Sequence, residues 1–443
     1  MNIQEITSRL KLTLSPMQQA VASAFLMDRR DLIVLSPTGS GKTLAYQLPL
    51  TQVIRQDIDE VQALILVPGR ELAIQSYEVF QSLHTGLRSY ACHGGRSAMD
   101  EHREIRKIRP QVVFSTPGRL LDHLNKQNIG SKAVTTFIID EFDKCLQLGF
   151  QNEMTGIVSR LPENIRKVFL SATAPVEEES ELFNISSFHL LDYRQTAYRQ
   201  SDRLQIFVVK SKDKDKLQAL DALLRDLNTH CSIVFLNYRD SVERTASFLR
   251  EKRFAVSAYH GSLDQKAREE TLYTFANHSS NILVSTDLGS RGLDIQGVEN
   301  IIHYHLPETE DAYIHRIGRT ARWNESGRVF FLLGPDEQLP SYIQAAKEYH
   351  PSPTSANPPL PLMATLYIGK GKKDKISKGD ILGYLCKTGK LNSKDIGRID
   401  VYDHYSLAAV SLEAAPKAIA NVKGQKIKGV KTIVDFHHGQ YSV

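Results

Sequence analysis

Short runs of apolar, often β-branched residues alternate with longer stretches of helical periodicity between residues 1 and 335. These runs fall into two successive sets of five. Such alternation is typical of parallel sheets covered by helices, so we expect two α/β domains of similar size. The expected strands are 32–35, 64–67, 112–115, 137–140 and 168–171, followed by 233–236, 256–259, 282–285, 301–304 and 329–333.

The pattern changes after residue 345. Pro351–Pro361 holds five prolines in eleven residues, which favours an extended, semi-rigid spacer over a packed element. Short apolar runs beyond it, at 365–368, 399–401, 408–412 and 431–434, indicate a small α+β domain. The 443 residues suit several domains, because single cores rarely grow past ~250–300 residues. We expect domains at 1–195, 203–345 and 362–443, a joint near 192–202, and a proline-rich linker at 346–361.

The composition is that of an ordinary soluble globular protein, with 41% hydrophobic and 24% charged residues. The N-terminal residues carry charges and no apolar block, which argues against a signal peptide, and no stretch approaches the ~18 apolar residues that span a bilayer. The four cysteines are scattered without a CxxC pair, which argues against a zinc site or a disulfide framework. We therefore expect a cytoplasmic protein with reduced thiols and no membrane partner.

The positive charge is concentrated at the C-terminus. The net charge of the chain is +5, yet residues 362–443 hold 14 Lys and Arg against 7 Asp and Glu. The remainder of the chain is slightly acidic, with 41 basic against 43 acidic residues. A basic excess of this kind suits a polyanionic partner, although a charge run alone is often only a solvated face.

The first candidate site follows the apolar run 32–35. A strand, a glycine-containing loop and a helix in this order form a phosphate-binding loop, although Ser36 stands where the usual pattern opens with Gly. Glycines let backbone N–H groups converge on phosphate oxygens, Lys42 adds a charge for the β- and γ-phosphates, and the Thr43 hydroxyl suits Mg²⁺. A chance glycine-serine turn is the alternative, which the preceding strand disfavours. The predicted nucleotide-binding residues are Ser36, Thr38, Gly39, Ser40, Gly41, Lys42 and Thr43.

The second candidate site is the acidic pair Asp140–Glu141, directly after the apolar run 137–139. Acids at the carboxyl end of a strand lie beside the phosphate loop in this class of fold. One carboxylate can hold a metal while its neighbour orients and deprotonates the attacking water. We assign Mg²⁺, partly through water, to Asp140 and Thr43, and the attacking water to Glu141. The simpler alternative is a pair of acids that opens a helix and compensates its dipole.

A third element, His315–Arg322, lies almost 180 residues downstream and places Arg319 and Arg322 three residues apart. Arginines that reach a γ-phosphate from another domain stabilise the charge of the transition state, an effect of ~10³–10⁵ in rate. If these arginines come from the second domain, hydrolysis requires the two domains to close. The nucleotide pocket then becomes a mechanical switch.

Further motifs accompany these three sites. They are Ser15–Gln18, Pro68–Ala73, Gly94–Gly95, Thr116–Arg119, Asp140–Asp143, Ser171–Thr173, Phe235 with Arg239, Gln265 with Arg268, and Thr286–Asp294. In this order they resemble the DEAD-box helicase family, over roughly residues 1–340. The resemblance implies two tandem RecA-like domains with parallel sheets, ATP and Mg²⁺ as cofactors, and RNA as the partner.

The resemblance also implies roles for single residues. Gln18 would read adenine, and Asp294 would contact the nucleotide. Catalysis would rest on Lys42, Asp140, Glu141, Arg319 and Arg322. The residues implied in coupling ATP to strand separation are Asp143, Ser171, Thr173 and His315. Those implied in RNA contact are Pro68, Gly69, Arg70, Gly95, Thr116, Arg119, Arg239, Arg268 and Thr286.

Several positions depart from the family pattern. Phe142 replaces the usual Ala, Gly69 replaces Thr, Ser290 replaces Ala, and Ala321 replaces Gly. Gly69 lacks a hydroxyl that would bond an RNA phosphate. The upstream aromatic residue of the adenine-reading motif has no counterpart, because its place is Met1. None of these changes touches the catalytic residues.

Residues 362 to about 435 resemble the RNA-binding domain attached to the DEAD-box protein A type of helicase. The blocks that carry this resemblance are Thr365–Ile368, Gly371–Ile376, Gly379–Gly383, Asp395–Asp400 and Ile427–Val430. It implies a small α+β fold like an RNA-recognition domain, and binding to a hairpin of large-subunit ribosomal RNA. Lysines crowd a glycine-containing loop, with Lys372 and Lys373 as the predicted phosphate contacts. A solvated basic loop is the alternative. Alternating aromatic residues for base stacking are not evident, so we expect loop contacts instead.

The sequence thus predicts an ATP-dependent RNA helicase that locally unwinds RNA or remodels ribonucleoprotein, targeted to large-subunit ribosomal RNA during ribosome assembly. Three alternatives stay open: a DNA-directed helicase, a general RNA helicase or chaperone without ribosomal specificity, and a non-catalytic, ATP-dependent RNA clamp. The motif set favours RNA over DNA. The presence of Lys42, Glu141, Arg319 and Arg322 argues against the clamp, because a clamp without turnover does not need them.

Overall fold

A computed structural model describes residues 2–37, 39–95, 97–174, 183, 185, 187–194, 204–228, 231–287, 297–320, 327–343, 346–352 and 357–437. The chain divides into two compact units, with the division along the sequence between Arg203 and Leu204. Among the residues described, no helix is long and apolar enough to cross a membrane.

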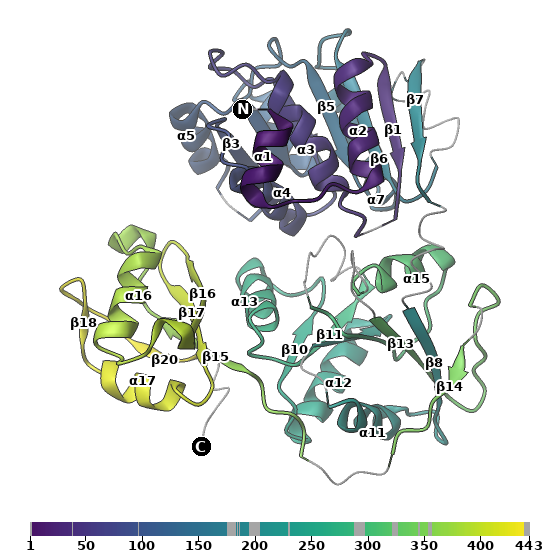
Figure 1. Cartoon of the computed structure of the whole chain (residues 1–443), viewed down its shortest axis with the longest axis vertical. Helices are drawn as coiled ribbons and strands as arrows, with labels where there is room; N and C mark the ends of the chain where they lie inside the picture. Colours follow the sequence, from purple (N-terminus) through teal and green to yellow (C-terminus); the bar gives the residue numbers. More distant parts are fainter. Residues whose placement is uncertain are drawn as a thin grey trace. The chain divides into compact units, whose positions relative to one another are not determined.

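The first unit is built on a seven-stranded parallel sheet with the strand order β3-β4-β2-β5-β6-β1-β7 (Figure 1). Its central strands are almost entirely buried, which is why they are continuous apolar runs without alternation. The strands are β1 (Asp31–Leu35), β2 (Ala63–Leu66), β3 (Ser89–Cys92), β4 (Val112–Ser115), β5 (Thr136–Asp140), β6 (Arg166–Ser171) and β7 (Phe188–Asp192).

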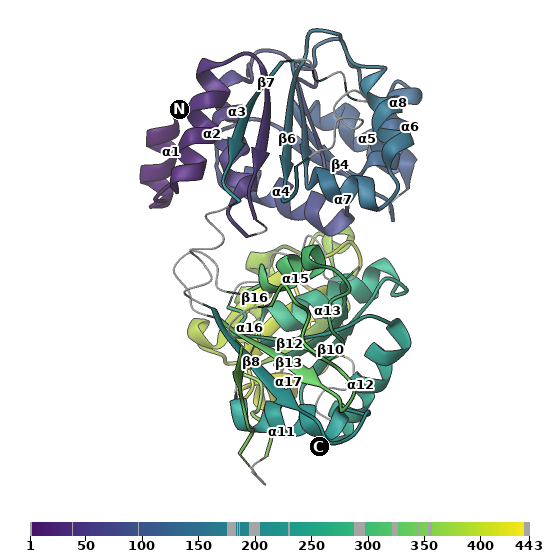
Figure 2. The ribbon, with the colours of Figure 1, turned by 90° about the vertical axis from the view of Figure 1, so that its right-hand side faces the viewer.

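Helices cover both faces of this sheet, and Figure 2 shows the two helical layers on either side of the strands. Four helices share a core with Leu32 and Val34, and the other four share a core with Ile33 and Leu35, because neighbouring side chains of a strand point to opposite faces. The first layer contains α1 (Ile3–Leu10), α2 (Pro16–Met27), α3 (Lys42–Val53) and α4 (Arg70–Ser82). The second contains α5 (Ala98–Ile108), α6 (Pro117–Asn125), α7 (Phe142–Gln147) and α8 (Gln151–Val158).

The second unit begins with another seven-stranded parallel sheet, in the order β10-β11-β9-β12-β13-β8-β14. Two helices, α11 (Leu217–Leu227) and α12 (Arg239–Glu251), share an apolar core with one face of it. Two more are α13 (Gln265–Ala276) and α15 (Glu310–Ile317). The strands are β8 (Leu204–Lys210), β9 (Ser232–Leu236), β10 (Val256–Tyr259), β11 (Ile282–Thr286), β12 (Asn300–His303), β13 (Gly327–Leu333) and β14 (Lys347–Glu348).

The same unit ends in a small domain with a four-stranded antiparallel sheet, in the order β16-β17-β15-β20. Helices α16 (Lys378–Lys387) and α17 (Ala415–Val422) pack on one face of the sheet. A hairpin of β18 (Lys426–Ile427) and β19 (Val430–Lys431) and the short helices η2 (Lys372–Asp374) and η3 (Ser393–Asp395) complete the domain. The sheet contains β15 (Met363–Ile368), β16 (Ile396–Val401), β17 (Ser406–Ser411) and β20 (Val434–Phe436).

The opposite face of this small sheet is not open, because α13 and the turn after it lie against it. The Thr365 hydroxyl accepts a hydrogen bond from Asn277 Nδ2 at 3.1 Å and donates to Ser279 Oγ at 2.8 Å, and all three side chains are buried. Tyr273 donates its hydroxyl hydrogen to the carbonyl oxygen of Arg398. Glu270 lies 3.2 Å from His437 Nε2. The C-terminal domain is therefore docked on the preceding domain rather than held by the proline-rich segment alone.

The predicted fold class is confirmed: two parallel-sheet domains are followed by a small α+β domain with an antiparallel sheet. Most predicted strands agree with the structure within one to three residues at each end. The exception is 431–434, which falls across the separate strands β19 and β20. Strands β3, β7, β8 and β14 were not predicted; β14 lies within the expected linker and pairs with β8.

Candidate nucleotide and RNA site

The predicted phosphate loop lies at the carboxyl end of β1 and leads directly into α3. Gly39 and Gly41 have positive φ angles of 80° and 84°, a backbone region that glycine enters at little cost. Ser36 donates from its backbone N–H to the carbonyl oxygen of Ser171 at 2.9 Å, and its hydroxyl lies 2.7 Å from that of Ser40. The loop is thereby fastened to the end of β6. Thr38 lies outside the described residues.

Two side chains at the start of α3 are directed into this region. Lys42 is buried, and its Nζ donates to the carbonyl oxygens of Ser36 at 2.6 Å and Pro37 at 2.9 Å. The Thr43 hydroxyl donates to Asp140 Oδ2 at 3.3 Å. The structure therefore brings together the loop, the lysine and the first of the two acids, as the sequence predicted.

The acidic pair lies at the carboxyl end of β5. Burial, followed by the charge of Glu141, raises the pKa of Asp140 from 3.8 to about 6, although Lys42 and the hydrogen bond from Thr43 act in the opposite direction. Glu141 begins α7 with a positive φ of 55°, an uncommon conformation for a residue with a side chain. Its backbone N–H donates to Asp140 Oδ1 at 3.0 Å.

Gln18 connects the adenine-reading motif to the phosphate loop. It forms a capping box at the start of α2: its N–H donates to Ser15 Oγ at 3.2 Å, and its Oε1 accepts from Ser15 N–H at 2.9 Å. Its Nε2 donates to the carbonyl oxygen of Gly41 at 3.2 Å. A Cβ atom at Gly41 would collide with that Nε2, so glycine is required there for space as well as for its φ angle. The amide is therefore placed against the loop that would hold the phosphates.

Three of the four residues predicted to couple ATP to RNA lie around the same strand ends. The Ser171 hydroxyl at the end of β6 accepts from the Thr173 N–H at 3.2 Å. Asp143 is buried in the first turn of α7, where its Oδ1 accepts from the Lys144 N–H at 3.0 Å. His315, the fourth of these residues, is buried near the end of α15 in the second unit.

Phe142, the departure within the acidic motif, has a structural reason. Its ring is buried and meets Phe169 and Phe183 edge-on, with centroid distances of 5.1 and 5.3 Å. Edge-to-face pairs of this kind contribute roughly 0.5–1.5 kcal/mol each beyond the area they bury. An alanine could not make these contacts. The substitution thus adds to the core beneath the acids and leaves the acids themselves in place.

The first-domain residues predicted to contact RNA gather at the carboxyl ends of β2, β3 and β4. Pro68 and Gly69 precede α4, Arg70 begins it, and Thr116 caps α6. A Cβ atom at Gly94 would lie 2.8 Å from Arg70 Nη2, so the glycine makes room for the guanidinium. Gly95 has a positive φ of 94°, and Arg119 lies in the first turn of α6. The three motifs therefore converge, although they are up to 50 residues apart in the sequence.

The second-domain residues predicted to contact RNA lie on three different elements. Arg239 begins α12 and donates from Nε to Asp240 Oδ1 at 3.1 Å. Arg268 in α13 lies over the ring of Tyr259, 5.5 Å from its centroid, and Thr286 ends β11.

Of the two arginines predicted to be catalytic, Arg319 is buried, and its Nε donates to the carbonyl oxygen of His315 at 3.3 Å. Asp294 and Arg322 lie outside the described residues.

Arg316, which the sequence analysis did not single out, makes several buried hydrogen bonds in the second parallel-sheet domain. It is buried, and its guanidinium binds Asp287 at 2.6 and 2.7 Å. It also donates to Asn237 Oδ1 at 2.8 Å and to the carbonyl oxygen of His305 at 2.8 Å. One arginine therefore fixes residues from the Phe235–Arg239, Thr286–Asp294 and His315–Arg322 motifs. In the sequence, the only indication of this role is that Arg316 lies in the same motif as Arg319.

In the predicted basic loop of the C-terminal domain, Lys372 and Lys373 are exposed and belong to the short helix η2. The loop is held in shape by its backbone: the N–H groups of Lys372 and Lys373 donate to the carbonyl oxygens of Tyr402 and Asp403 at 2.8 and 2.9 Å. The sequence did not show the alternating aromatic residues of a stacking platform, but the structure contains a stack of tyrosines. Tyr402 and Tyr405 stack with centroids 4.6 Å apart, and Tyr405 stacks on Tyr367 at 5.6 Å. Tyr402 and Tyr405 meet across a turn, and the pairing of β15 with β17, which the sequence does not display, brings Tyr367 to them.

Comparisons with known proteins agree with this geometry. The DEAD/DEAH box helicase family matches residues 15–182, the helicase conserved C-terminal domain matches residues 215–324, and the DbpA RNA binding domain matches residues 365–435. The ATP-dependent RNA helicase DbpA of Escherichia coli (strain K12) is 33% identical over 439 residues, which is 94% of this chain and 93% of that protein. The DEAD-box ATP-dependent RNA helicase RhpA of Helicobacter pylori (strain ATCC 700392 / 26695) is 35% identical over 332 residues, 73% of this chain and 65% of that protein.

Solved structures share the fold. Mss116 bound to single-stranded RNA and UDP-BeF has a TM-score of 0.70 and 25% identity, covering 79% of this chain and 78% of that one. S. cerevisiae Dbp5 bound to RNA and ADP BeF3 has a TM-score of 0.68 and 24% identity, covering 75% and 87%. Both relatives carry a nucleotide and RNA on this architecture.

The raised pKa of Asp140 predicts a stabilising substitution. The Asp140 carboxyl stays protonated to higher pH in the folded protein than in the unfolded chain. The contribution of Asp140 to the free energy of unfolding therefore falls as the pH rises from 3.8 to about 6. Asp140→Asn should therefore stabilise the nucleotide-free protein near neutral pH by roughly 2–3 kcal/mol, since one pKa unit is worth about 1.4 kcal/mol. Urea unfolding of both proteins at about pH 4.5 and about pH 7.5 tests this. A stabilisation that is equal at the two pH values would contradict it.

Proposed function

This chain belongs to the DEAD-box family of ATP-dependent RNA helicases and carries a DbpA-type RNA-binding domain, and on that premise we propose that it remodels large-subunit ribosomal RNA during ribosome assembly in the cytoplasm. Its enzymatic activity is RNA-stimulated ATP hydrolysis. The observation that carries the enzymatic part is the acid pair beside the phosphate loop, of which Asp140 is buried. The observation that carries the targeting part is the basic loop of a docked C-terminal domain. The absence of disulfides among the four cysteines, all of which are described, suits a reducing compartment.

The residues of the first domain divide the chemistry of hydrolysis between them. The Asp140 carboxyl and the Thr43 hydroxyl are oxygen ligands of the kind that Mg²⁺ prefers, and a carboxyl that burial keeps partly protonated gains most from a cation. The ion, when bound, would supply positive charge that offsets the charge of the phosphates. We assign to Glu141 the role of orienting the attacking water and accepting its proton. Lys42 exchanges its contacts to the loop carbonyls for the β- and γ-phosphates.

The arginines of the second domain complete the site in this proposal. Arg319 and Arg322 stabilise the charge on the γ-phosphate when the two domains close on ATP and RNA. Arg316 takes no part in the chemistry; it holds the motif that presents them. Because the bound strand is gripped through its sugar-phosphate backbone, sequence contributes little, and discrimination against DNA comes from the 2′-hydroxyls. A bent strand does not fit duplex geometry, so closure opens a short duplex locally.

In this proposal the C-terminal domain selects the RNA on which the helicase acts. Its small sheet is covered by α16 and α17 on one face and contacted by α13 on the other, so we assign RNA contact to an exposed loop, the one with Lys372 and Lys373, rather than to a face of the sheet. Docking also fixes the C-terminal domain relative to the second parallel-sheet domain. An RNA hairpin bound to the loop would therefore be held at a set distance from that domain.

One observation favours a second candidate, a general RNA helicase without ribosomal specificity. Several basic residues of this domain are paired with acids of the same domain: Lys370 with Asp374 at 3.0 Å, Lys378 with Asp400 at 3.3 Å, and Lys428 with Asp380 at 3.1 Å. These pairs reduce the charge that is offered to RNA. The second experiment below separates the two candidates.

Glu141→Gln should abolish turnover while ATP and RNA binding stay close to wild type. The carboxamide keeps the size and hydrogen bonding of the side chain but cannot accept the proton of the attacking water. The measurement is the ATPase rate at saturating RNA, with ATP and RNA affinities determined separately by titration. Turnover within a factor of two of wild type would remove Glu141 from the mechanism.

Reversing the charge of the basic loop should reduce the preference for ribosomal RNA. In Lys372→Glu/Lys373→Glu, the concentration of large-subunit ribosomal RNA that half-saturates the ATPase should rise by about tenfold or more, while that of an unrelated strand changes little. The salt dependence of binding should also weaken, because fewer counterions are released. Deleting the whole domain is a poorer test, since it would expose Tyr273 and Asn277.

The matched control is Lys387→Glu/Lys394→Glu, which makes the same change at two exposed lysines of the same domain outside the loop. It should keep the preference for ribosomal RNA. Equal half-saturating concentrations of both RNAs for the unmodified protein would show that the domain does not target, and would support the general helicase instead.

A further inference from the structure

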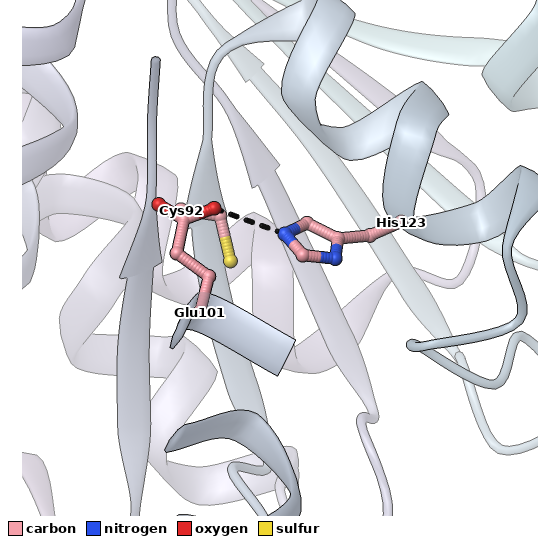
Figure 3. A group of neighbouring side chains, drawn as sticks. All are labelled: Cys92, Glu101 and His123. Atoms are coloured by element: carbon pink, nitrogen blue, oxygen red, sulfur yellow. Dashed lines mark hydrogen bonds and ion pairs between the residues drawn. The ribbon is translucent and has the colours of Figure 1, made fainter. Parts of the chain in front are cut away.

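Glu101 in α5 is a carboxyl group with only 1% of its surface exposed, outside the nucleotide site. Its Oε1 accepts a hydrogen bond from the backbone N–H of His93 at 3.0 Å, and its Oε2 lies 3.0 Å from His123 Nε2. Figure 3 shows the carboxyl group and the imidazole facing each other beside Cys92. An ionised group so fully removed from water costs several kcal/mol unless a countercharge and hydrogen bonds compensate it.

The countercharge is not His123. Its Nδ1 lies 3.2 Å from the amide nitrogen of Asn128, which is a donor, so Nδ1 offers its lone pair. The proton of the imidazole is then on Nε2, from which it is donated to Glu101. This leaves a neutral ring that is fixed in orientation by a bond at each nitrogen.

The positive partner of Glu101 is Arg119. Its Nε lies 3.3 Å from Glu101 Oε2, with 15% of the arginine side chain exposed and none of the glutamate side chain. The pair is thus buried at one end and open at the other. Glu101 thus contacts the Nε side of the guanidinium, and a small part of the arginine side chain stays exposed.

The same carboxyl group also holds the neighbouring motif. His93, whose N–H it receives, immediately precedes Gly94–Gly95. The guanidinium of Arg70 in turn lies against Gly94, where any side chain would displace it. Through one carboxylate, α5 therefore connects Arg119, the glycine pair and, indirectly, Arg70, which come from three separate motifs.

We propose that Glu101 is a positioning residue for RNA binding: it does not touch RNA, but it sets the guanidinium of Arg119 and the Gly94–Gly95 turn in the orientation that grips the strand. This inference rests on the proposed function, in which Arg119 and Gly95 contact RNA. It adds a residue from α5, outside the motifs, to the machinery of the first domain. Because these groups are already oriented before RNA binds, less conformational entropy is lost on binding.

A metal centre is the other use that this cluster offers. One ligand atom each from Cys92, Glu101 and His123 lies within 4.8 Å of the others, and all three residues are buried. The guanidinium of Arg119, however, already supplies a positive charge to the carboxylate, and the His123 nitrogen that faces it carries a proton. A cation would have to displace both. The arrangement therefore fits a hydrogen-bonded ion pair better than a metal site.

The test is Glu101→Gln, which keeps the shape and one acceptor oxygen but removes the charge. Glu104→Gln, the same change at an exposed position of α5, is the control. The RNA concentration that half-saturates the ATPase should rise about tenfold in Glu101→Gln, as expected for one lost charge-assisted bond. The maximal ATPase rate, ATP affinity without RNA and the unfolding midpoint should stay near those of the control. Should Glu101→Gln fail to fold, Glu101→Asp, which keeps the charge but withdraws it from the guanidinium, is expected to give the same loss.

A double-mutant cycle with Arg119→Ala shows whether Glu101 acts through the arginine. The double variant should bind RNA no worse than Arg119→Ala alone, because the effects of coupled residues are not additive. Additive effects, an unchanged half-saturating RNA concentration in Glu101→Gln, a fall in maximal rate alone, or one zinc ion per purified chain would overturn the inference and leave the proposed function standing. If Arg119→Ala itself leaves RNA binding unchanged, the RNA contact of the proposed function fails, and the inference fails with it.

Discussion

The first domain depends on one constraint, the burial of the Asp140 carboxyl between the phosphate loop and the Glu141 turn. Burial and the neighbouring acid disfavour the ionised form, so this position destabilises the nucleotide-free protein near neutral pH. In the proposed function, the same features would make it a strong oxygen ligand for a cation that binds together with the phosphates. The buried Asp140 carboxylate therefore lowers the free energy of unfolding of the nucleotide-free protein. The packing of Phe142, Phe169 and Phe183 beneath the acids offsets part of this loss.

Buried charges serve a second purpose in this protein, which is to hold motifs in register. Arg316 joins three motifs of the second domain through Asp287, Asn237 and the His305 carbonyl. Glu101 does the same in the first domain through His93, His123 and Arg119. Breaking a buried ion pair by removing one partner is costly, because the remaining charge is left uncompensated. Neither hub is exposed to solvent, so each can orient exposed residues without competing with them for ligands.

The sequence was sufficient for the fold class and the central strands, because each is a continuous apolar run that a parallel sheet buries on both faces. It also showed which residues would lie together at the proposed nucleotide site, because the phosphate loop and the acid pair are short contiguous motifs at strand ends. The edge strands β3, β7 and β14 were missed, since edge positions are short or mixed in polarity. Long-range pairings were missed for a different reason: nothing local in Thr365, Asn277 or Glu101 shows which distant group will meet it. The docking of the C-terminal domain is the main result of this kind.

The central claim is that ATP hydrolysis by this protein is driven by RNA. The most direct measurement is the ATPase rate of the purified full-length chain at saturating ATP, recorded while RNA is added. The account predicts a rate that rises several-fold with RNA and then saturates, because RNA favours the closed arrangement that completes the site. A rate that is the same with and without RNA would contradict it.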